Sequence, residues 1–247
     1  MQKRTIISNG KKYLVNVPGW EDGVFVDGGS LSFGSASQYL SVQSSSKWAV
    51  STGSFTVEWW QYQTLQPGGT FPRVFTVDVW PNAELAVSIE GGGDFYPWID
   101  KAGNATAVAN GFTITAPYIN TWTHFAMVRE SGSFMRMYQN GIVMKTITGS
   151  AYVTANINNT TKSLLIGGET GANEATTRFP GYITNFRFVN GYALYSASFT
   201  SPYSPMPVPG TVFLLNADSA QAPYVYDNSG YNNPIVQNSV SWSSAAP

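Results

Sequence analysis

The sequence predicts an all-β protein in which two antiparallel sheets pack face to face as a sandwich. The stretch 122–141, WTHFAMVRESGSFMRMYQNG, has the pattern of two short strands joined by a tight turn. Apolar and polar residues alternate with a period of two in several other apolar runs. Gly, Ser, Thr and Asn are frequent between these runs, as expected where many strands are connected by turns.

The hairpin at residues 122–141 is the element that the sequence predicts most clearly. Its second strand places Met135 and Met137 on one face, and Phe134, Arg136 and Tyr138 on the other. The Asn-Gly pair at 140–141 is a strong hairpin-turn signal. A further apolar strand at 142–147 is therefore predicted to return alongside it.

Strands are predicted on both sides of this hairpin. Their expected positions are 31–33, 38–42, 55–60, 74–79, 85–89, 163–168, 179–188, 212–215, 235–236 and 240–242, with a weaker pair within 104–116. We expect the inward positions to form one core between the sheets. The residues predicted to lie there are Trp59, Phe125, Met127, Leu165 and Ile183.

The N-terminal residues 1–29 differ from residues 30–247, which form the predicted sandwich domain. Two short apolar runs flank Asn9-Gly10 and predict a β-hairpin, followed by an irregular connector. The cations Lys3, Arg4, Lys11 and Lys12 lie on this hairpin. It is either a strand pair added to the sandwich or an arm that docks on a neighbouring subunit.

Composition excludes several classes of protein. The 247 residues fit one β-sandwich domain, and a hydrophobic content of 43% is ample for its core. A net charge of −1 gives no electrostatic basis for binding nucleic acid or membranes, and no apolar run is long enough to insert into a membrane. The absence of cysteine excludes disulfides and thiolate chemistry.

The expected location follows from the N-terminus and the composition. Residues 1–17 lack the apolar core of a signal peptide, so we expect synthesis in a cytoplasm. The turn-rich, weakly charged composition suits an exposed shell. A protein on the exterior of a bacteriophage virion meets both conditions, because it folds in the host and works outside it.

Several motifs resemble laminin-G-like domains, which are concanavalin-A-like jelly rolls. One is Trp-x-His followed by Arg-x-Tyr-x-Asn-Gly, at Trp122, His124, Arg136, Tyr138, Asn140 and Gly141. Others are FPGYITNFRF at 179–188 and GYALY at 191–195. The resemblance spans roughly residues 30–242 and implies a jelly-roll sandwich. The succession of loops further resembles laminin-G-like virion proteins of tailed phages, especially marine ones.

The sequence does not predict an enzyme. His124 is the single histidine and has no nucleophile at a recognisable spacing, so we expect it to be structural. Glycoside hydrolases need paired carboxylates, and the Glu-x-Asp-x-x-Glu strand signature of hydrolases with this fold is absent. Glu58 stands alone on its strand, and Asp94 and Asp100 are expected in a loop.

A calcium site is the more favourable chemical possibility, although no cofactor is required. The polar segment after Gly168 carries Glu169, Asn173 and Glu174, whose oxygens are ligands that calcium prefers. The resemblance implies the same site, because pentraxins carry an acidic calcium loop at this place. Their partner Asp-Asn pair is missing from residues 66–73, which favours a solvated polar turn as the alternative.

Aromatic residues give a second possible binding site. Sugars stack on exposed rings and bond to nearby polar side chains. The segment DFYPWID combines both kinds of residue, and a tryptophan lies in an earlier loop. The candidate glycan-binding residues are Trp80, Asp94, Phe95, Tyr96, Trp98 and Asp100. The alternative is that these rings cover an edge of the sandwich or pack on a neighbour.

These observations predict a non-enzymatic surface protein of a tailed-phage virion, as a fibre, spike or capsid-decorating subunit. Its lectin-like domain is expected to bind surface polysaccharide. Its other expected partners are virion proteins or further copies of itself. The alternative is a purely structural subunit that binds virion neighbours alone. A glycoside hydrolase or lyase is a third class, which paired carboxylates in a common cleft would support.

Overall fold

The structure is a computed structural model that describes residues 2–8, 11–17, 28–34, 37–66, 70–79, 82–90, 93–101, 104–107, 112–149, 151–158, 160–171, 174–219 and 222–247. Side chains are described for these residues except 2–17, 100–112, 151 and 174. Within the described residues, no helix has the length and apolar character needed to cross a membrane.

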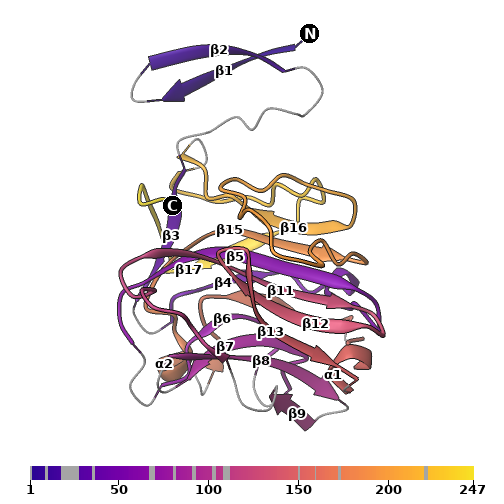
Figure 1. The fold of residues 1–247 in the computed structure, drawn as a ribbon. Coiled ribbons are helices and arrows are strands. Elements are labelled where there is room, and N and C mark those ends of the chain that lie inside the picture. Colours follow the sequence, from indigo (N-terminus) through magenta and orange to yellow (C-terminus); the bar gives the residue numbers. More distant parts are fainter. Residues whose placement is uncertain are drawn as a thin grey trace.

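Two large antiparallel sheets form the body (Figure 1). The first, here the β5 sheet, has the order β13 (Ile142–Thr148), β12 (Phe134–Gln139), β11 (Trp122–Glu130), β5 (Phe55–Gln63), β15 (Gly181–Asn190), β3 (Ser30–Phe33) and β18 (Ser241–Ser243). A further strand, β16 (Thr211–Leu215), pairs with β15.

The second sheet, here the β8 sheet, lies beneath the first in Figure 1. Its order is β10 (Phe112–Thr113), β8 (Asp94–Lys101), β7 (Leu85–Glu90), β6 (Arg73–Val77), β14 (Leu164–Ile166), β4 (Tyr39–Val42) and β17 (Ile235–Asn238), and β9 (Asn104–Ala107) pairs with β8. The hairpin predicted at the N-terminus is confirmed as β1 (Gln2–Ser8) and β2 (Lys11–Val17), which pair in a two-stranded sheet of their own.

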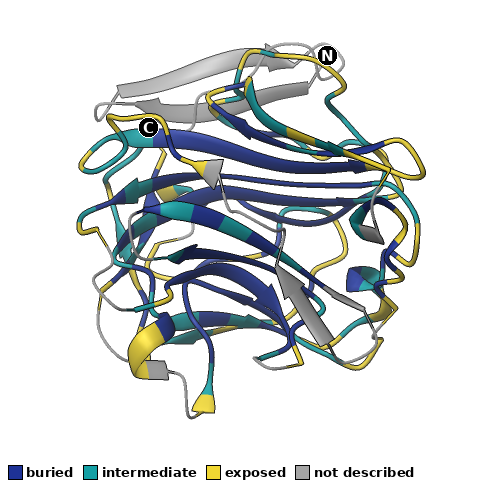
Figure 2. Cartoon of the chain, turned by 60° about the horizontal axis from the view of Figure 1, so that its bottom comes forward, coloured by how far each residue is buried: buried dark blue, intermediate teal, exposed yellow. Residues whose placement is uncertain are grey.

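The described helices are short: η1 (Ser46–Trp48), α1 (Ala151–Thr154) and α2 (Glu174–Thr177). The predicted all-β, two-sheet antiparallel jelly-roll sandwich is therefore confirmed. The strands are buried along most of their length, whereas exposed residues gather in the connections (Figure 2).

One apolar core fills the space between the sheets, as the alternation predicted. Phe55, Val57 and Trp59 point inward from β5, and Trp59 lies at the centre of an aromatic cluster. Its ring centroid is 5.8 Å from that of Phe75 on the opposite sheet and 5.9 Å from that of Phe125. Burial of these rings between the two sheets removes a large apolar area from water and stabilises the sandwich.

Four of the five predicted core residues are confirmed: Trp59, Phe125, Met127 and Ile183 are buried between the sheets. The prediction for Leu165 is wrong, because its side chain points away from the core between the sheets. Leu164 and Ile166, its neighbours on β14, belong to the core, and successive strand residues point to opposite faces. Leu165 is therefore buried on the outer face of the β8 sheet, at 3% exposure.

The segment of residues 191–210, here the strap, covers the outer face of the β5 sheet (Figure 1). The rings of Tyr195 and Phe199 stack with parallel planes and pack on Tyr138 of β12. The strap and the sheet enclose a second, smaller apolar cluster with Ala126 and Val128. The turn Asn140-Gly141 supports the strap, because the Phe199 amide donates to the Gly141 carbonyl at 2.9 Å.

The segment Asp94–Asp100, expected as a loop, lies in strand β8. The expectation of a loop is wrong: the segment follows a run of glycines in the sequence and contains a proline, which cannot complete a sheet ladder on both sides, yet it forms a strand. Among the described strands, β10 pairs with residues 94–95 and β9 pairs with residues 98–101, so Pro97 lies between the two pairings. The strand therefore accommodates the proline.

Candidate functional site

The best candidate site lies on the outer face of strands β7 and β8. Phe95, Pro97 and Ile99 are buried, whereas Asp94, Tyr96 and Trp98 alternate with them and are partly exposed. Because strand side chains alternate between faces, the three partly exposed residues share the surface that points away from the core. A strand with two aromatic rings and a carboxylate on this surface is unusual for a merely solvated face.

The register of β7 adds polar groups to this surface. Residues directly opposite each other in a sheet share a face, and Tyr96 is opposite Ser88 while Asp94 is opposite Glu90. On the next strand, Arg73 is opposite Ser88. A row of side chains therefore runs across three strands. We name this set the β7–β8 face; it consists of Arg73, Ser88, Glu90, Asp94, Tyr96 and Trp98.

Hydrogen bonds fix the orientation of the aromatic part of this face. The Trp98 indole Nε1 donates to the Ser88 hydroxyl at 2.7 Å. That hydroxyl contacts the Glu90 carboxylate oxygen Oε1 at 3.2 Å. Trp98 is therefore held against β7 by its N–H edge, and its orientation is set before any ligand arrives.

Glu90 is the titratable group at the centre of this arrangement. Partial burial raises the pKa of Glu90, and the Ser88 hydrogen bond and the positive charge of Arg73 offset this effect only in part. Its carboxylate is thus partly, but not fully, removed from solvent. It is suited to accept a hydrogen bond from a ligand.

Arg73 connects this face to the segment predicted to bind calcium. Its Nε donates to the Glu169 Oε1 at 2.9 Å, and a terminal nitrogen donates to the Phe71 carbonyl at 3.2 Å. Glu169 is 1% exposed, and its second oxygen, Oε2, has no hydrogen-bond partner among the described residues. The two sites predicted from the sequence are therefore neighbours on one face.

The structure separates the predicted glycan-binding residues into three groups. Asp94, Tyr96 and Trp98 lie together on the β7–β8 face. The prediction for Phe95 is wrong, because its ring is fully buried and packs 4.5 Å from Phe125 between the sheets. Trp80 and the side chain of Asp100 lie outside the described residues.

The predicted metal ligands and arm cations are described only in part. Glu169 is placed as above, whereas Asn173 and the side chain of Glu174 lie outside the described residues. Within the described part of the chain, no three His, Cys, Asp or Glu side chains come together as a metal site. The side chains of Lys3, Arg4, Lys11 and Lys12 also lie outside it.

A second constellation, on the outer face of the β5 sheet, has the residue types of an active site. Glu58 is fully buried and its Oε1 accepts from Arg187 Nε at 2.6 Å. Its Oε2 accepts from the Tyr195 hydroxyl at 2.9 Å and lies 3.2 Å from His124 Nε2. Burial alone would raise the pKa of Glu58, but His124 and Arg187 together outweigh it and hold the pKa below its usual value.

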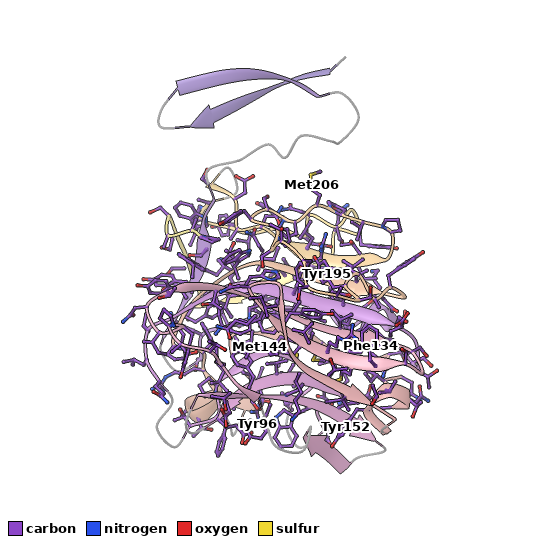
Figure 3. All side chains as sticks on the ribbon, viewed as in Figure 1. Tyr96, Phe134, Met144, Tyr152, Tyr195 and Met206 are labelled. Carbon is purple, nitrogen blue, oxygen red and sulfur yellow. The ribbon has the colours of Figure 1, made fainter. Side chains whose placement is uncertain are left out.

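The Glu58 constellation is enclosed by the strap, which assigns it a structural role. Arg187 donates to the Met206 carbonyl at 2.6 Å, and Trp60 donates to the Pro202 carbonyl at 2.7 Å. Burial and the adjacent Glu58 carboxylate raise the pKa of Tyr195, which keeps its proton. Figure 3 shows Tyr195 and Met206 on one side of the body and Tyr96 on the opposite side. The candidate ligand face is thus remote from this network.

Sequence reasoning missed Ser88, Glu90 and Arg73 as parts of the site. The signal that could have found them is the alternation Ala86, Ser88, Glu90 on β7, which matches Trp98, Tyr96, Asp94 on an antiparallel neighbour. Because residues 94–100 were assigned to a loop, their pairing with β7 was not predicted.

Comparison with known families and structures agrees with this architecture. Residues 33–197 match the model of a laminin-G-like family described as the concanavalin A-like lectin/glucanases superfamily. No curated protein sequence matches the chain.

Solved structures with a similar fold include three informative neighbours. A putative carbohydrate binding protein from Bacteroides ovatus has a TM-score of 0.62 at 15% identity, over 94% of this chain and 66% of that one. A heptameric SAP-like pentraxin from Limulus polyphemus has a TM-score of 0.56 at 13% identity, over 90% and 97% of the two chains. The CBM40 domain of a Ruminococcus gnavus sialidase has a TM-score of 0.50 at 11% identity, over 68% and 92%.

Proposed function

The chain belongs to the concanavalin A-like lectin/glucanases superfamily, and from this premise we propose that it is a non-enzymatic protein that binds glycans on the β7–β8 face. The observation that carries the proposal is the position of Tyr96 and Trp98, partly exposed beside Glu90 and Asp94. Two rings supply apolar faces for the C–H surface of a sugar, and the carboxylates accept its hydroxyl protons. The fold neighbours that bear carbohydrate-binding names support the same function.

A glycan array followed by calorimetry tests this proposal. The intact chain should bind at least one saccharide, and Trp98→Ala should weaken that binding by about tenfold or more, as expected for a central aromatic contact. Tyr224→Ala is the matched control, because Tyr224 is 64% exposed and lies outside the β7–β8 face. Equal affinity in both variants and the parent would contradict the proposed site.

Calcium is the proposed ligand of the neighbouring segment with Glu169, Asn173 and Glu174. The support is the unpartnered Glu169 Oε2 beside Arg73, together with the oxygen-rich sequence around it. Few carboxylates imply weak affinity, in the range of about 10⁻⁴–10⁻³ M. The same titrations are therefore repeated with millimolar calcium and with a chelator, and heat of calcium binding in the absence of sugar is the expected result. If calcium produces no heat of binding, this segment is a solvated polar turn and not a calcium site.

The proposed setting is the exterior of a tailed-phage particle, as a fibre, spike or capsid-decorating subunit. Its support is the turn-rich, weakly charged composition and the succession of motifs over residues 191–229, from GYALY through the proline-rich crossing to Asp-Asn-Ser, which resembles laminin-G-like virion proteins. Four of the chain's 13 lysines and arginines lie in residues 1–17, which contain none of its 14 acids. This polarised charge favours docking of the hairpin arm on an acidic neighbour.

The alternative is a structural subunit whose partners are virion proteins or copies of itself. It is favoured by the β1–β2 sheet, because an isolated two-stranded hairpin is marginal in water and gains stability by pairing. Deletion of residues 1–19 should leave the sandwich folded and abolish any oligomer of the intact chain, as measured by sedimentation. A truncated chain that fails to fold would show that the hairpin belongs to the domain core.

One observation favours hydrolysis, the third class of function. Glu90, whose pKa is raised by partial burial, lies opposite Asp94, and paired carboxyl groups act as acid and base in glycosidases. Glycosidic cleavage places the two groups on either side of the scissile bond, whereas cross-strand neighbours reach a sugar on the sheet from the same side. We therefore assign the pair to binding. Release of reducing ends during the titrations would overturn that assignment.

A further inference from the structure

The charges around the β7–β8 face restrict the chemistry of its ligand, an inference that rests on the proposed glycan-binding function. Glu90 and Asp94 are directly opposite each other in the register of β7 and β8, so both side chains are on this face, and the carboxylate of Glu169 contacts Arg73 beside it. Among the described side chains, Arg73 bonds to Glu169 and acts electrostatically on Glu90. Negative charge therefore exceeds positive charge among these four residues.

Arg73 is already engaged and does not present its charge to a ligand. Its side chain is buried, with the residue 6% exposed, and it donates to Glu169 and to the Phe71 carbonyl. An arginine that receives a sugar carboxylate or sulfate needs free N–H groups in a fork geometry. Arg73 instead neutralises Glu169, which leaves Glu90 and Asp94 as the charges that a ligand meets among the described residues of this face.

Glu90 and Asp94 provide acceptors for ligand donors. Glu90 is partly desolvated, and the Ser88 hydroxyl donates to its Oε1 at 3.2 Å. A second anion beside a desolvated carboxylate is strongly disfavoured, because the local dielectric constant is lower than that of water. Sugar hydroxyls and ammonium groups are donors and are favoured for the same reason.

We propose that the β7–β8 face selects saccharides that are uncharged or carry free amines, and rejects saccharides that carry carboxylate, sulfate or phosphate groups. Tyr96 and Trp98 supply the stacking surface for either kind of sugar. Glu90 and Asp94 supply the discrimination between them. An amino sugar forms an ion pair with one of the two carboxylates in addition to the stacking contact.

Matched saccharide pairs that differ only in charge test this selectivity on the intact chain. Suitable pairs are glucosamine and N-acetylglucosamine oligomers, hexose and hexuronate oligomers, and unsulfated and sulfated galactans. In the hexose–hexuronate and galactan pairs, wherever the neutral member binds, the anionic member should bind roughly tenfold or more weakly. The amine-bearing member should bind at least as well as its N-acetylated counterpart, with an advantage that decreases at high salt.

Charge-neutralising variants test whether Glu90 and Asp94 cause the discrimination against anionic saccharides. The double variant Glu90→Gln with Asp94→Asn should lose most of the discrimination against the anionic members. Glu130→Gln removes an exposed carboxylate at the end of β11 and should leave the discrimination unchanged. Stronger binding of an anionic member, or unchanged discrimination in the double variant, overturns the inference while glycan binding stands. Absence of binding to every saccharide would reject the proposed function and this inference together.

Discussion

At the scale of single residues, Glu58 shows how a buried charge is used to hold a surface segment in place. Its two carboxylate oxygens accept hydrogen bonds from Arg187 and Tyr195 and contact His124 Nε2. These three residues come from two other strands and the strap. A carboxylate so far from water persists only where donors replace its hydration. Glu58 therefore connects β5, β11 and β15 to the strap through one side chain.

The lowered pKa of Glu58 makes this connection sensitive to acid. A carboxyl group whose pKa is lower in the folded state contributes stability above its usual pKa, near 4.5, and that contribution is lost as the pH falls through the folded value. Glu58→Gln should lower the free energy of unfolding at neutral pH by about 3–5 kcal/mol, because Arg187 then stays buried without its partner. The variant's stability should also depend less on pH below 4.5.

Denaturant unfolding at neutral and acidic pH measures both effects. His124→Ala is a milder comparison, with an expected loss of ~1–3 kcal/mol and unchanged glycan affinity. A Glu58→Gln protein as stable as the parent, or equally sensitive to acid, would show that Glu58 does not anchor the strap.

Glu58 also shows what a sequence does not reveal about a residue. On its own strand it has no acidic or basic neighbour, and its partners lie 66, 129 and 137 positions away. Only the pairing of β5 with β11 and β15 brings them together. The structural role predicted for His124, by contrast, followed from its being the single histidine on an apolar strand.

At the scale of elements, the Asn140-Gly141 turn both closes a hairpin and supports the strap. Asn140 and Gly141 have φ values of 49° and 75°, the left-handed conformation that this turn requires. A Cβ atom at position 141 would collide with the Phe199 carbonyl of the strap. Glycine is thus needed at this position for conformation and for space.

Comparison of two glycines separates these two requirements. Gly132 has a φ of 71°, and a Cβ atom there would contact nothing, so Gly132→Ala should cost only the left-handed conformation, about 1–2 kcal/mol. Gly141→Ala should cost at least about 1 kcal/mol more, because the strap must also move. Chemical denaturation of both variants measures the difference. Equal losses would show that the strap adapts without strain.

Strand β8 explains why the fold was more predictable than the site. Most strands were predicted from period-2 alternation, which can be recognised in the sequence without knowing which strands pair with one another. In β8 the same alternation is present, but the preceding glycines and Pro97 indicated a loop. The pairing of β9 and β10 on either side of Pro97 is a tertiary feature, and with it the aromatic face becomes recognisable. Leu165 was misassigned for a related reason, since three consecutive apolar residues do not reveal which one faces outward.

At the scale of the whole molecule, the two outer faces of the sandwich differ in what covers them. The strap covers the outer face of the β5 sheet with apolar rings over a buried ion network. The outer face of the β8 sheet presents Tyr96 and Trp98, partly exposed, beside two carboxylates. The proposed ligand face and the strap therefore lie on opposite outer faces of the sandwich.

The position of a bound saccharide tests this assignment most directly. A crystal structure of the intact chain with its best-binding saccharide should show a sugar ring stacked on Trp98 or Tyr96, with hydroxyl or ammonium groups donating to Glu90 or Asp94. A saccharide bound instead beside the strap, or at any place that does not contact the β7–β8 face, would contradict the account.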